Sequence, residues 1–388
     1  MLNRRLLRSK VVQALYAIVI AEESNRQLAY DEIAEAYKPD LNSMEPQNLP
    51  QLEGYRQLAV LSFDELVDTG KFTPSDEIPY DVELTAKKAY AAYRNANQRD
   101  RQHAVRRVLA ETENIYSNVL YALRFLTDLA HSARLERSRT HHNVDDPIPL
   151  RSGLDSNAII QALEADKQFS DECIRRGVTW SNDLDIIQRT YREVLRQDGA
   201  YRAYCERVEH SLEEDQELIQ YIFRTIIFKN QLFTDYMEAR DLYWEDHRDL
   251  VRSLVIKTLK SVTEDGKITL AELTDDWEDD KFFVEESVTK TLVEEERFEG
   301  YLKEILQNWD NERLAKVDML IIKAALAEMI YFPGIPVKVT INEYIETAKR
   351  YSTLQSGKFV NGLLDTLSER LIKEKVIRKS GRGLIDNQ

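Results

Sequence analysis

The stretch of sequence that decides the fold is IPVKVTINEYIETAKRYSTLQSGKFVNGLLD, which runs from Ile335 to Asp365. Asn342 follows Thr340 and precedes Glu343, an order that suits the N-cap of a helix, because the Asn side chain can accept a hydrogen bond from a free backbone N–H. Gly362 leaves room for close packing between helices. The segment just before this stretch leads into another helix that ends near Met329. The C-terminal hundred residues are therefore predicted to be all-α.

Upstream of this stretch, five segments share a spacing of about 32 residues. Their anchors lie 32, 32, 33 and 32 positions apart and are Trp180, Leu212, Trp244, Trp277 and Trp309. An aromatic residue stands eleven positions before four of these anchors, at Phe169, Tyr201, Phe233 and Phe298. Paired apolar residues follow each anchor at four-residue intervals, as on one helix face. Because a fixed period indicates a copied structural unit, we expect an array of helix pairs.

Composition limits the remaining possibilities. The 388 residues can form two or three domains, and the scarcity of Gly (12) and Pro (9) favours long helices. No run approaches the length of a membrane-spanning segment, so we expect no membrane partner. Cys173 and Cys205 occupy equivalent positions in two repeats, where other copies have Met237 and Leu302. We interpret both cysteines as core residues and expect a cytoplasmic location.

The first 140 residues are predicted to be largely helical. One helix is expected over residues 2–23, with its arginines in the first two turns, and helical periodicity returns over residues 82–139. The Pro-containing residues 38–82 between them are expected to be irregular, apart from a short helix near Leu58–Val67. The net charge is -15, yet residues 1–20 carry four cations and no acid. This uneven charge indicates a local anionic ligand rather than general binding of polyanions.

Two motifs in the C-terminal stretch, taken with the N-terminus, resemble a known family. The first runs from Ile335 to Glu343 and the second from Lys358 to Asp365, while Arg4, Arg5 and Arg8 precede the sequence VQALY, residues 12–16. Together these motifs look like those of the transcription antitermination factor NusB family. The resemblance covers about residues 1–24 and 277–375. Leu6 interrupts the arginine run, and Gln355–Gly357 depart from the more polar stretch common in the family.

The resemblance implies a fold, a function and partners. The fold is an all-α, NusB-like helical bundle with an inserted array of helix pairs. The function is that of a non-enzymatic, RNA-binding transcription antitermination factor. Such a protein binds boxA-like single-stranded nascent RNA together with ribosomal protein S10 in an RNA polymerase elongation complex. By position, the resemblance places Asp318 at the contact with S10 and assigns RNA contacts to Arg4, Arg5, Arg8, Gln13, Tyr16, Lys358 and Phe359.

Other interpretations of these residues stay open on the sequence alone. The arginines also suit a solvated helix face, and Tyr16 and Phe359 also suit a core. Asp318 could pair with Lys316 or Lys323 in its own helix. For the whole chain, the alternative is a helical-repeat scaffold for protein interactions on an inherited NusB-like fold that does not bind RNA.

Signals for enzymatic chemistry are weak. The sequence has no glycine-rich phosphate loop after a strand and no recognisable nucleophile elbow. His141 and His142 near Asp145 and Asp146 could bind a metal, but a solvated turn is the simpler interpretation. We therefore expect no catalytic residue, no metal and no cofactor.

The sequence predicts five regions: a basic N-terminal helix of the NusB-like core (1–24), a helical and irregular insertion (25–157), helix-pair repeats (158–276), a NusB-like C-terminal helical domain (277–375) and a basic tail (376–388).

Overall fold

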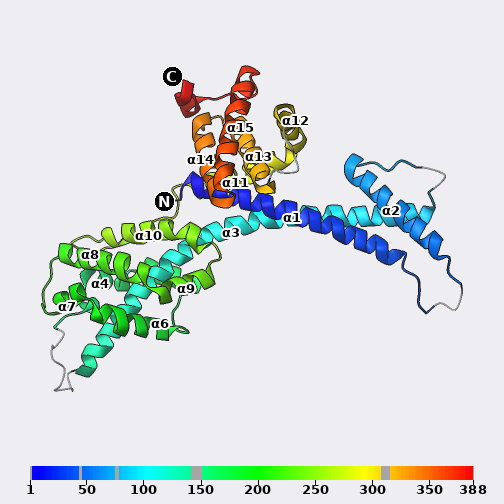
Figure 1. Ribbon diagram of the computed structural model, residues 1–388. Helices are drawn as coiled ribbons and strands as arrows, with labels where there is room; N and C mark the ends of the chain where they lie inside the picture. Colours follow the sequence, from blue (N-terminus) through cyan, green and yellow to red (C-terminus); the bar gives the residue numbers. More distant parts are fainter. Residues whose placement is uncertain (1, 43–45, 75–77, 141–150, 307–314, 388) are drawn as a thin grey trace. The chain divides into compact units, whose positions relative to one another are not determined.

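All the regular secondary structure in the parts that the structure describes is helical. Figure 1 shows the computed structural model, which describes residues 2–42, 46–74, 78–140, 151–306 and 315–387. All regular elements in these ranges are helices, which confirms the predicted all-α class. The chain forms two compact units: Met1–Leu6 with Ala110–Trp277, and Leu7–Leu109 with Glu278–Gln388. The five predicted regions are finer than these units, and their boundaries stay a prediction.

Three long helices make up the first 140 residues: α1 (Arg4–Ala36), α2 (Leu49–Thr69) and α3 (Tyr80–Thr140). The expectation of a mostly irregular segment over residues 38–82 is wrong, because α2 alone has 21 residues. Asn48 caps its start by accepting a hydrogen bond from the Gln51 N–H, and Gly70 ends it with a φ of 68°. Both are ordinary helix-boundary signals, which apolar periodicity alone did not reveal.

In the second unit, α1, α2 and the first part of α3 share a small apolar core. Its centre is Phe63 of α2, whose ring packs edge-on against Tyr30 of α1 and Tyr93 of α3, with centroid distances of 5.5 and 5.7 Å. Aliphatic residues from all three helices complete this cluster: Ala29, Ile33, Ala59, Val82, Ala86 and Ala89. Such a shared core stabilises the three helices, because most helical stability in proteins comes from packing of an apolar face rather than from propensity.

The first unit contains the predicted helix-pair array, packed on the second part of α3. Its helices are α4 (Ala158–Ala165), α5 (Lys167–Arg176), α6 (Leu184–Arg189), α7 (Gly199–Cys205), α8 (Leu212–Tyr221), α9 (Gln231–Arg240) and α10 (Trp244–Lys260). The centre of this core is aromatic. Trp180 is fully buried, lies 4.9 Å from the Phe125 ring of α3, and donates its indole N–H to the Tyr121 carbonyl at 3.1 Å.

The 32-residue period recurs in the local geometry of the array. Asp166, Asp198 and Asn230 are 32 residues apart, and each caps the helix that carries the repeat aromatic. The helices before two of these caps both widen into a π-helical turn, over Thr190–Val194 and Ile222–Ile226. Cys173, Cys205 and Met237 are all buried, and both cysteines are free, as expected. The last anchor, Trp309, lies outside the described residues.

The second unit also contains a helical bundle that we call the C-terminal bundle: α11 (Trp277–Val293, whose first residue belongs to the first unit), α12 (Glu295–Ile305), α13 (Lys316–Tyr331), α14 (Val337–Tyr351) and α15 (Leu354–Lys373). The part of α1 that carries Arg8 and Gln13 contacts this bundle. Helix α13 is buried almost all round between Leu320 and Met329, as expected for a central helix. Helix α14 packs against both α13 and α15.

One local expectation in the C-terminal bundle is wrong. Helix α14 begins at Val337 after Pro336, so Asn342 lies inside the helix and is not its N-cap. Proline readily precedes or opens a helix because its φ is already helical and no N–H is lost there. Separately, none of the helices in the described ranges combines the length and the apolar character that crossing a membrane requires.

Candidate nucleic-acid interface

The start of α1 is buried in the C-terminal bundle, and Arg8 is the centre of the contact. Its side chain is only 3% exposed and binds Glu328 of α13 through two hydrogen bonds of 2.7 and 2.8 Å. Glu328 is also fully buried and accepts a 2.7 Å hydrogen bond from the Thr340 hydroxyl. Burial alone would lower the pKa of Arg8, but the hydrogen bond and charge of Glu328 raise it. Arg8 therefore joins α1 to α13.

This placement revises the role expected for Arg8. Three further groups surround its guanidinium: the Glu343 carboxylate at 3.8 Å and the rings of Phe283 and Tyr344, whose centroids are 5.9 and 6.0 Å away. A phosphate could reach this arginine only by displacing a buried carboxylate, and leaving a buried carboxylate unpaired is costly. Arg8 is thus a buried structural residue rather than an exposed phosphate ligand.

Gln13 of α1 and Tyr351 at the end of α14 are brought together although they are 338 positions apart. The Gln13 amide donates a hydrogen bond to the Tyr351 hydroxyl at 3.0 Å. Tyr16 lies one helical turn after Gln13, and its side chain is 42% exposed. The core alternative for Tyr16 is therefore wrong, and its ring is accessible to solvent. Tyr351 was not predicted, since no local sequence signal marks a partner so far along the chain.

The predicted residues Lys358 and Phe359 lie in the second turn of α15, close after Tyr351 in the chain. Lys358 is exposed and Phe359 is half-buried. Thr353 caps the helix by accepting a hydrogen bond from the Ser356 N–H, and Ser356 bonds back to Thr353. The first turn has no acidic residue, so the positive end of the helix dipole is not neutralised there.

Gly357 allows the end of α14 to cover the start of α15. A Cβ placed on Gly357 would lie 3.0 Å from Lys349 Cγ, which is tighter than ordinary carbon–carbon contacts. The Lys349 stem thus lies against the first turn of α15, while its ammonium binds Glu346 at 2.6 Å.

We call the group formed by Gln13, Tyr16, Tyr351, Lys358 and Phe359 the bundle surface. It combines a cation, aromatic rings and an amide, which single-stranded RNA requires.

Arg4 and Arg5 open α1 and belong to the first compact unit. Arg5 is exposed and Arg4 is half-buried. Both take part in interactions within the protein, so neither side chain is uncommitted. The structure therefore separates the three predicted arginines: Arg5 is accessible, Arg4 partly so, and Arg8 is buried.

The expected contact through Asp318 also needs revision. Asp318 lies in the first turn of α13, but its side chain is only 5% exposed, so a partner protein could not reach its carboxylate directly. The alternative pairings are not formed either. Lys316 binds Glu23, and Lys323 binds Glu295 and Glu299. The sequence placed Asp318 on a helix, as the structure shows, but it did not reveal the inward direction of this side chain.

Among the described residues, no cluster of three or more His, Cys, Asp or Glu side chains is arranged to hold a metal ion. His141 and His142, which the sequence offered as a metal site, lie outside the described residues.

Comparisons with known proteins agree on the C-terminal part. The sequence model of the NusB family matches residues 249–369. A transcription antitermination protein NusB from Chloroherpeton thalassium is 40% identical over 106 residues, which are 27% of this chain and 50% of that protein. The corresponding protein from Natranaerobius thermophilus is 34% identical over 93 residues, 24% of this chain and 67% of that protein. The one from Salinibacter ruber is 38% identical over 103 residues, 26% of this chain and 64% of that protein.

The class is thus that of all-helical proteins related to transcription antitermination factors. The chain belongs to the NusB family. It spans half to about two thirds of the length of these relatives, and the rest of its 388 residues extends beyond the match. No solved structure matches the chain.

Proposed function

We propose that this protein is a non-enzymatic, RNA-binding transcription antitermination factor. It binds boxA-like single-stranded RNA together with ribosomal protein S10 in an RNA polymerase elongation complex. The observation that carries the proposal is the hydrogen bond between Gln13 and Tyr351. It joins the first helix to the α14–α15 junction, and so it connects the two ends of the sequence that resemble the family's RNA-binding segments.

Each residue of the bundle surface has a distinct proposed role. Lys358 and the start of α15 attract a phosphate, because a cation and the positive end of a helix dipole act together there. Tyr16 and the accessible part of Phe359 stack against bases. The hydrogen bond to Tyr351 holds the Gln13 amide in place beside them. At the start of α1, Arg4 and Arg5 contribute phosphate contacts of their own.

Arg8 supports this site from below. Its buried pair with Glu328 fixes α1 on α13, and through α1 it fixes the orientation of Gln13 and Tyr16. It is a positioning residue that does not touch RNA. S10 remains a proposed partner, and we propose that it contacts exposed residues of this protein rather than the buried Asp318 carboxylate.

The test is RNA binding by the full chain with S10, measured by fluorescence anisotropy at two salt concentrations. We expect Tyr16→Ala with Lys358→Ala to weaken binding of boxA-like RNA about tenfold or more, because one stacked base alone is worth about 1–3 kcal/mol. The slope of log affinity against log salt should decrease by roughly 0.7, the contribution of one single-strand phosphate contact.

The matched control removes one exposed Tyr and one exposed Lys elsewhere, with Tyr80→Ala and Lys303→Ala. Unchanged RNA affinity in the double variant, equal to this control, would contradict the bundle surface. S10 binding without any RNA binding would favour the alternative, a helical scaffold for protein interactions.

A further inference from the structure

A second basic feature lies in α3, outside the residues that match the family. Between Lys87 and Arg107 the helix carries seven lysines and arginines and one acidic residue, in a chain whose net charge is -15. Two hollows line this part of α3, and both belong to the second compact unit. The first, of about 830 Å³, lies between α3, Glu22 of α1 and Val67 of α2. The second, of about 460 Å³, lies between α3 and α11.

The two hollows are adjacent along α3. Arg101 and Gln102 line both of them, so the hollows meet along a single face of α3. Arginines are distributed along the whole groove: Arg94 lines the first hollow, Arg101 the shared part, and Arg106 the second. Successive arginines are seven and five residues apart, about 10 and 8 Å along the helix axis. We call this feature the α3 groove.

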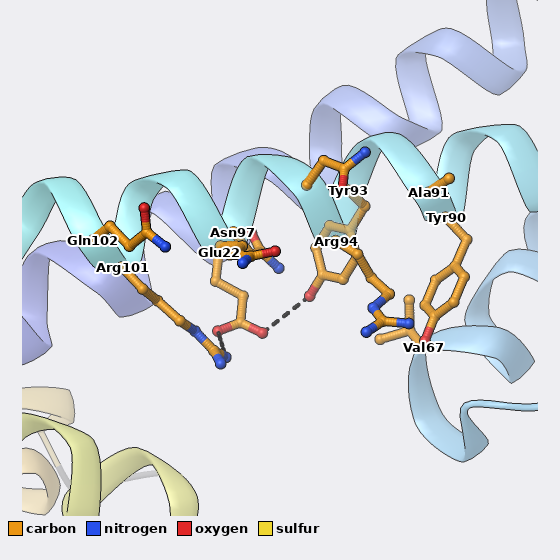
Figure 2. Close-up of a pocket in the computed structure, with 11 residues that line it drawn as sticks. Glu22, Val67, Tyr90, Ala91, Tyr93, Arg94, Asn97, Arg101 and Gln102 are labelled. Atoms are coloured by element: carbon orange, nitrogen blue, oxygen red, sulfur yellow. Dashed lines mark hydrogen bonds and ion pairs between the residues drawn. The ribbon is translucent and has the colours of Figure 1, made fainter.

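Ion pairs within the protein leave the arginines of the α3 groove able to bind a ligand. Within the parts of the chain that the structure describes, no carboxylate is in ion-pair contact with Arg94 or Arg106. Arg101 lies 3.5 Å from the Glu22 carboxylate, but its side chain is 47% exposed, so water weakens that pair. Glu22 also accepts a hydrogen bond from the Tyr93 hydroxyl at 3.1 Å, which holds the carboxylate in place (Figure 2).

Aromatic and amide groups stand beside these cations. Arg94 lies over the Tyr90 ring, 5.7 Å from its centroid, and Figure 2 shows the side chains of Tyr90, Arg94 and Arg101 on the same side of α3. An arginine and a ring in this arrangement form a platform on which a base can stack. Four amides also line the groove: Asn95, Asn97, Gln98 and Gln102. Amides both donate and accept hydrogen bonds, as the edges of bases require.

From this geometry we infer that the α3 groove binds single-stranded RNA independently of sequence, as a second site separate from the bundle surface. The inference rests on the proposed function, which makes RNA the ligand of this chain. An acidic peptide would also satisfy the arginines, but it would not use Tyr90 or the acceptor oxygens of the amides. Glu22 and Glu285 line the groove and reduce its net positive charge. This favours a ligand that both stacks on aromatic rings and carries negative charge.

The test compares four forms of the full chain: the wild type, the groove variant Arg94→Ala/Arg101→Ala/Arg106→Ala, the bundle variant Tyr16→Ala/Lys358→Ala, and a charge control. The charge control is Arg56→Ala/Arg297→Ala/Arg370→Ala, which removes the same number of partly exposed arginines from ion pairs elsewhere in the second unit. Circular dichroism checks that each variant is folded. Anisotropy then measures binding of labelled oligouridine and, with S10, of boxA-like RNA at two salt concentrations.

We expect the groove variant to lose about tenfold or more in affinity for oligouridine, and its salt slope to decrease by roughly two, because each of three phosphate contacts contributes about 0.7. The charge control should bind like the wild type. Arg→Lys substitution at the same three positions should retain the salt slope and lose part of the affinity, since lysine stacks poorly.

The two proposals fail in different ways. If the groove variant binds oligouridine with unchanged affinity and slope, the α3 groove is overturned, whatever happens with boxA-like RNA. If poly-glutamate displaces oligouridine as well as unlabelled oligouridine does, the assignment to RNA is also overturned, and the groove is a general acidic-ligand site. Loss of oligouridine binding in the groove variant, with the bundle variant unaffected on boxA-like RNA, would sustain the groove and remove the bundle surface.

Discussion

The helix-pair array and the C-terminal bundle are stabilised by different interiors. In the array the centre is aromatic: Trp180 packs on Phe125, and Phe125 packs on Phe233, with ring centroids 4.9 and 5.1 Å apart. In the C-terminal bundle the centre is charged, because Arg8 and Glu328 form a buried pair between α1 and α13. A cavity in the aromatic core should therefore destabilise the array, whereas loss of one charged partner should destabilise the bundle because the other charge stays buried and unpaired.

This difference explains why the periodic aromatic residues were interpreted correctly from the sequence, whereas one arginine of the basic N-terminal run was not. In the array, the periodic aromatic residues are buried and mark packing, as their spacing indicated. In the bundle, an arginine in a basic N-terminal run was expected to bind RNA, yet Arg8 is buried. A charged residue near a functional site can thus be part of the scaffold, and only its burial distinguishes the two roles.

The largest effect is expected for Trp180→Ala in the array. Removing a fully buried indole from among aromatic rings should destabilise the first unit by about 3–5 kcal/mol, because the surrounding core cannot close the cavity. Urea unfolding followed by circular dichroism measures this change. The exposed Leu242→Ala in the same unit is the control. A midpoint equal to that of the control would show that the aromatic core does not stabilise the array.

The next effect concerns the charged centre of the bundle. Arg8→Ala should cost about 3 kcal/mol, because the carboxylate of Glu328 remains buried without its cationic partner. Replacing both charges, with Arg8→Met and Glu328→Leu, should recover most of this loss, since an apolar pair of similar volume leaves no unpaired charge. Arg297→Ala, which removes an exposed pair with Glu294, should cost under about 1 kcal/mol.

In that comparison, the decisive measurement is the unfolding free energy of the double variant relative to Arg8→Ala. We expect Arg8→Ala to be costly mainly because it leaves the Glu328 carboxylate buried and unpaired. A double variant that is less stable than Arg8→Ala would contradict this.

The smallest effect uses the two cysteines, which both belong to the array. Burial raises the pKa of Cys173 and of Cys205 to about 11. Only about one thiol in 300 would then be ionised at pH 8.5, so alkylation should be about a hundredfold slower in the native state than in denaturant. Because the folded pKa is raised, the stability contributed by each neutral thiol is present below the ordinary thiol pKa and is lost as pH rises toward 11.

Alkylation with iodoacetamide, followed by mass spectrometry, reports on the array alone. The alkylation rate should stay low in Arg8→Ala if loss of the charged pair in the C-terminal bundle leaves the aromatic core of the array folded. Rapid labelling of either cysteine in the native wild type would contradict its place in the core.

The sequence predicted most of the fold because its signals are local. Apolar periodicity placed α3 and the start of α1, and the 32-residue spacing placed the array, but α1 was expected to end at residue 23 and runs to Ala36. It missed the length of α2, which Asn48 and Gly70 delimit, and it placed an N-cap at Asn342 where Pro336 had already begun α14. These are boundary errors, which propensity and periodicity determine least well.

The candidate site was less predictable because it depends on distant contacts. Nothing near Gln13 indicates Tyr351, nothing near Arg8 indicates Glu328, and nothing near Asp318 indicates that its carboxylate points inward. The α3 groove could have been suspected from the cations between Lys87 and Arg107. Its shape could not, since Glu22 and Val67 reach it from other helices.

The central claim is that RNA contacts the second compact unit, on the bundle surface and in the α3 groove. The most direct measurement is photo-crosslinking of 4-thiouridine-labelled boxA-like RNA to the full chain with S10, with the crosslinked peptides identified by mass spectrometry. We expect crosslinks to peptides that contain Tyr16, Phe359 or Tyr90. Crosslinks confined to the helix-pair array, or none above the background of an unlabelled RNA, would contradict the claim.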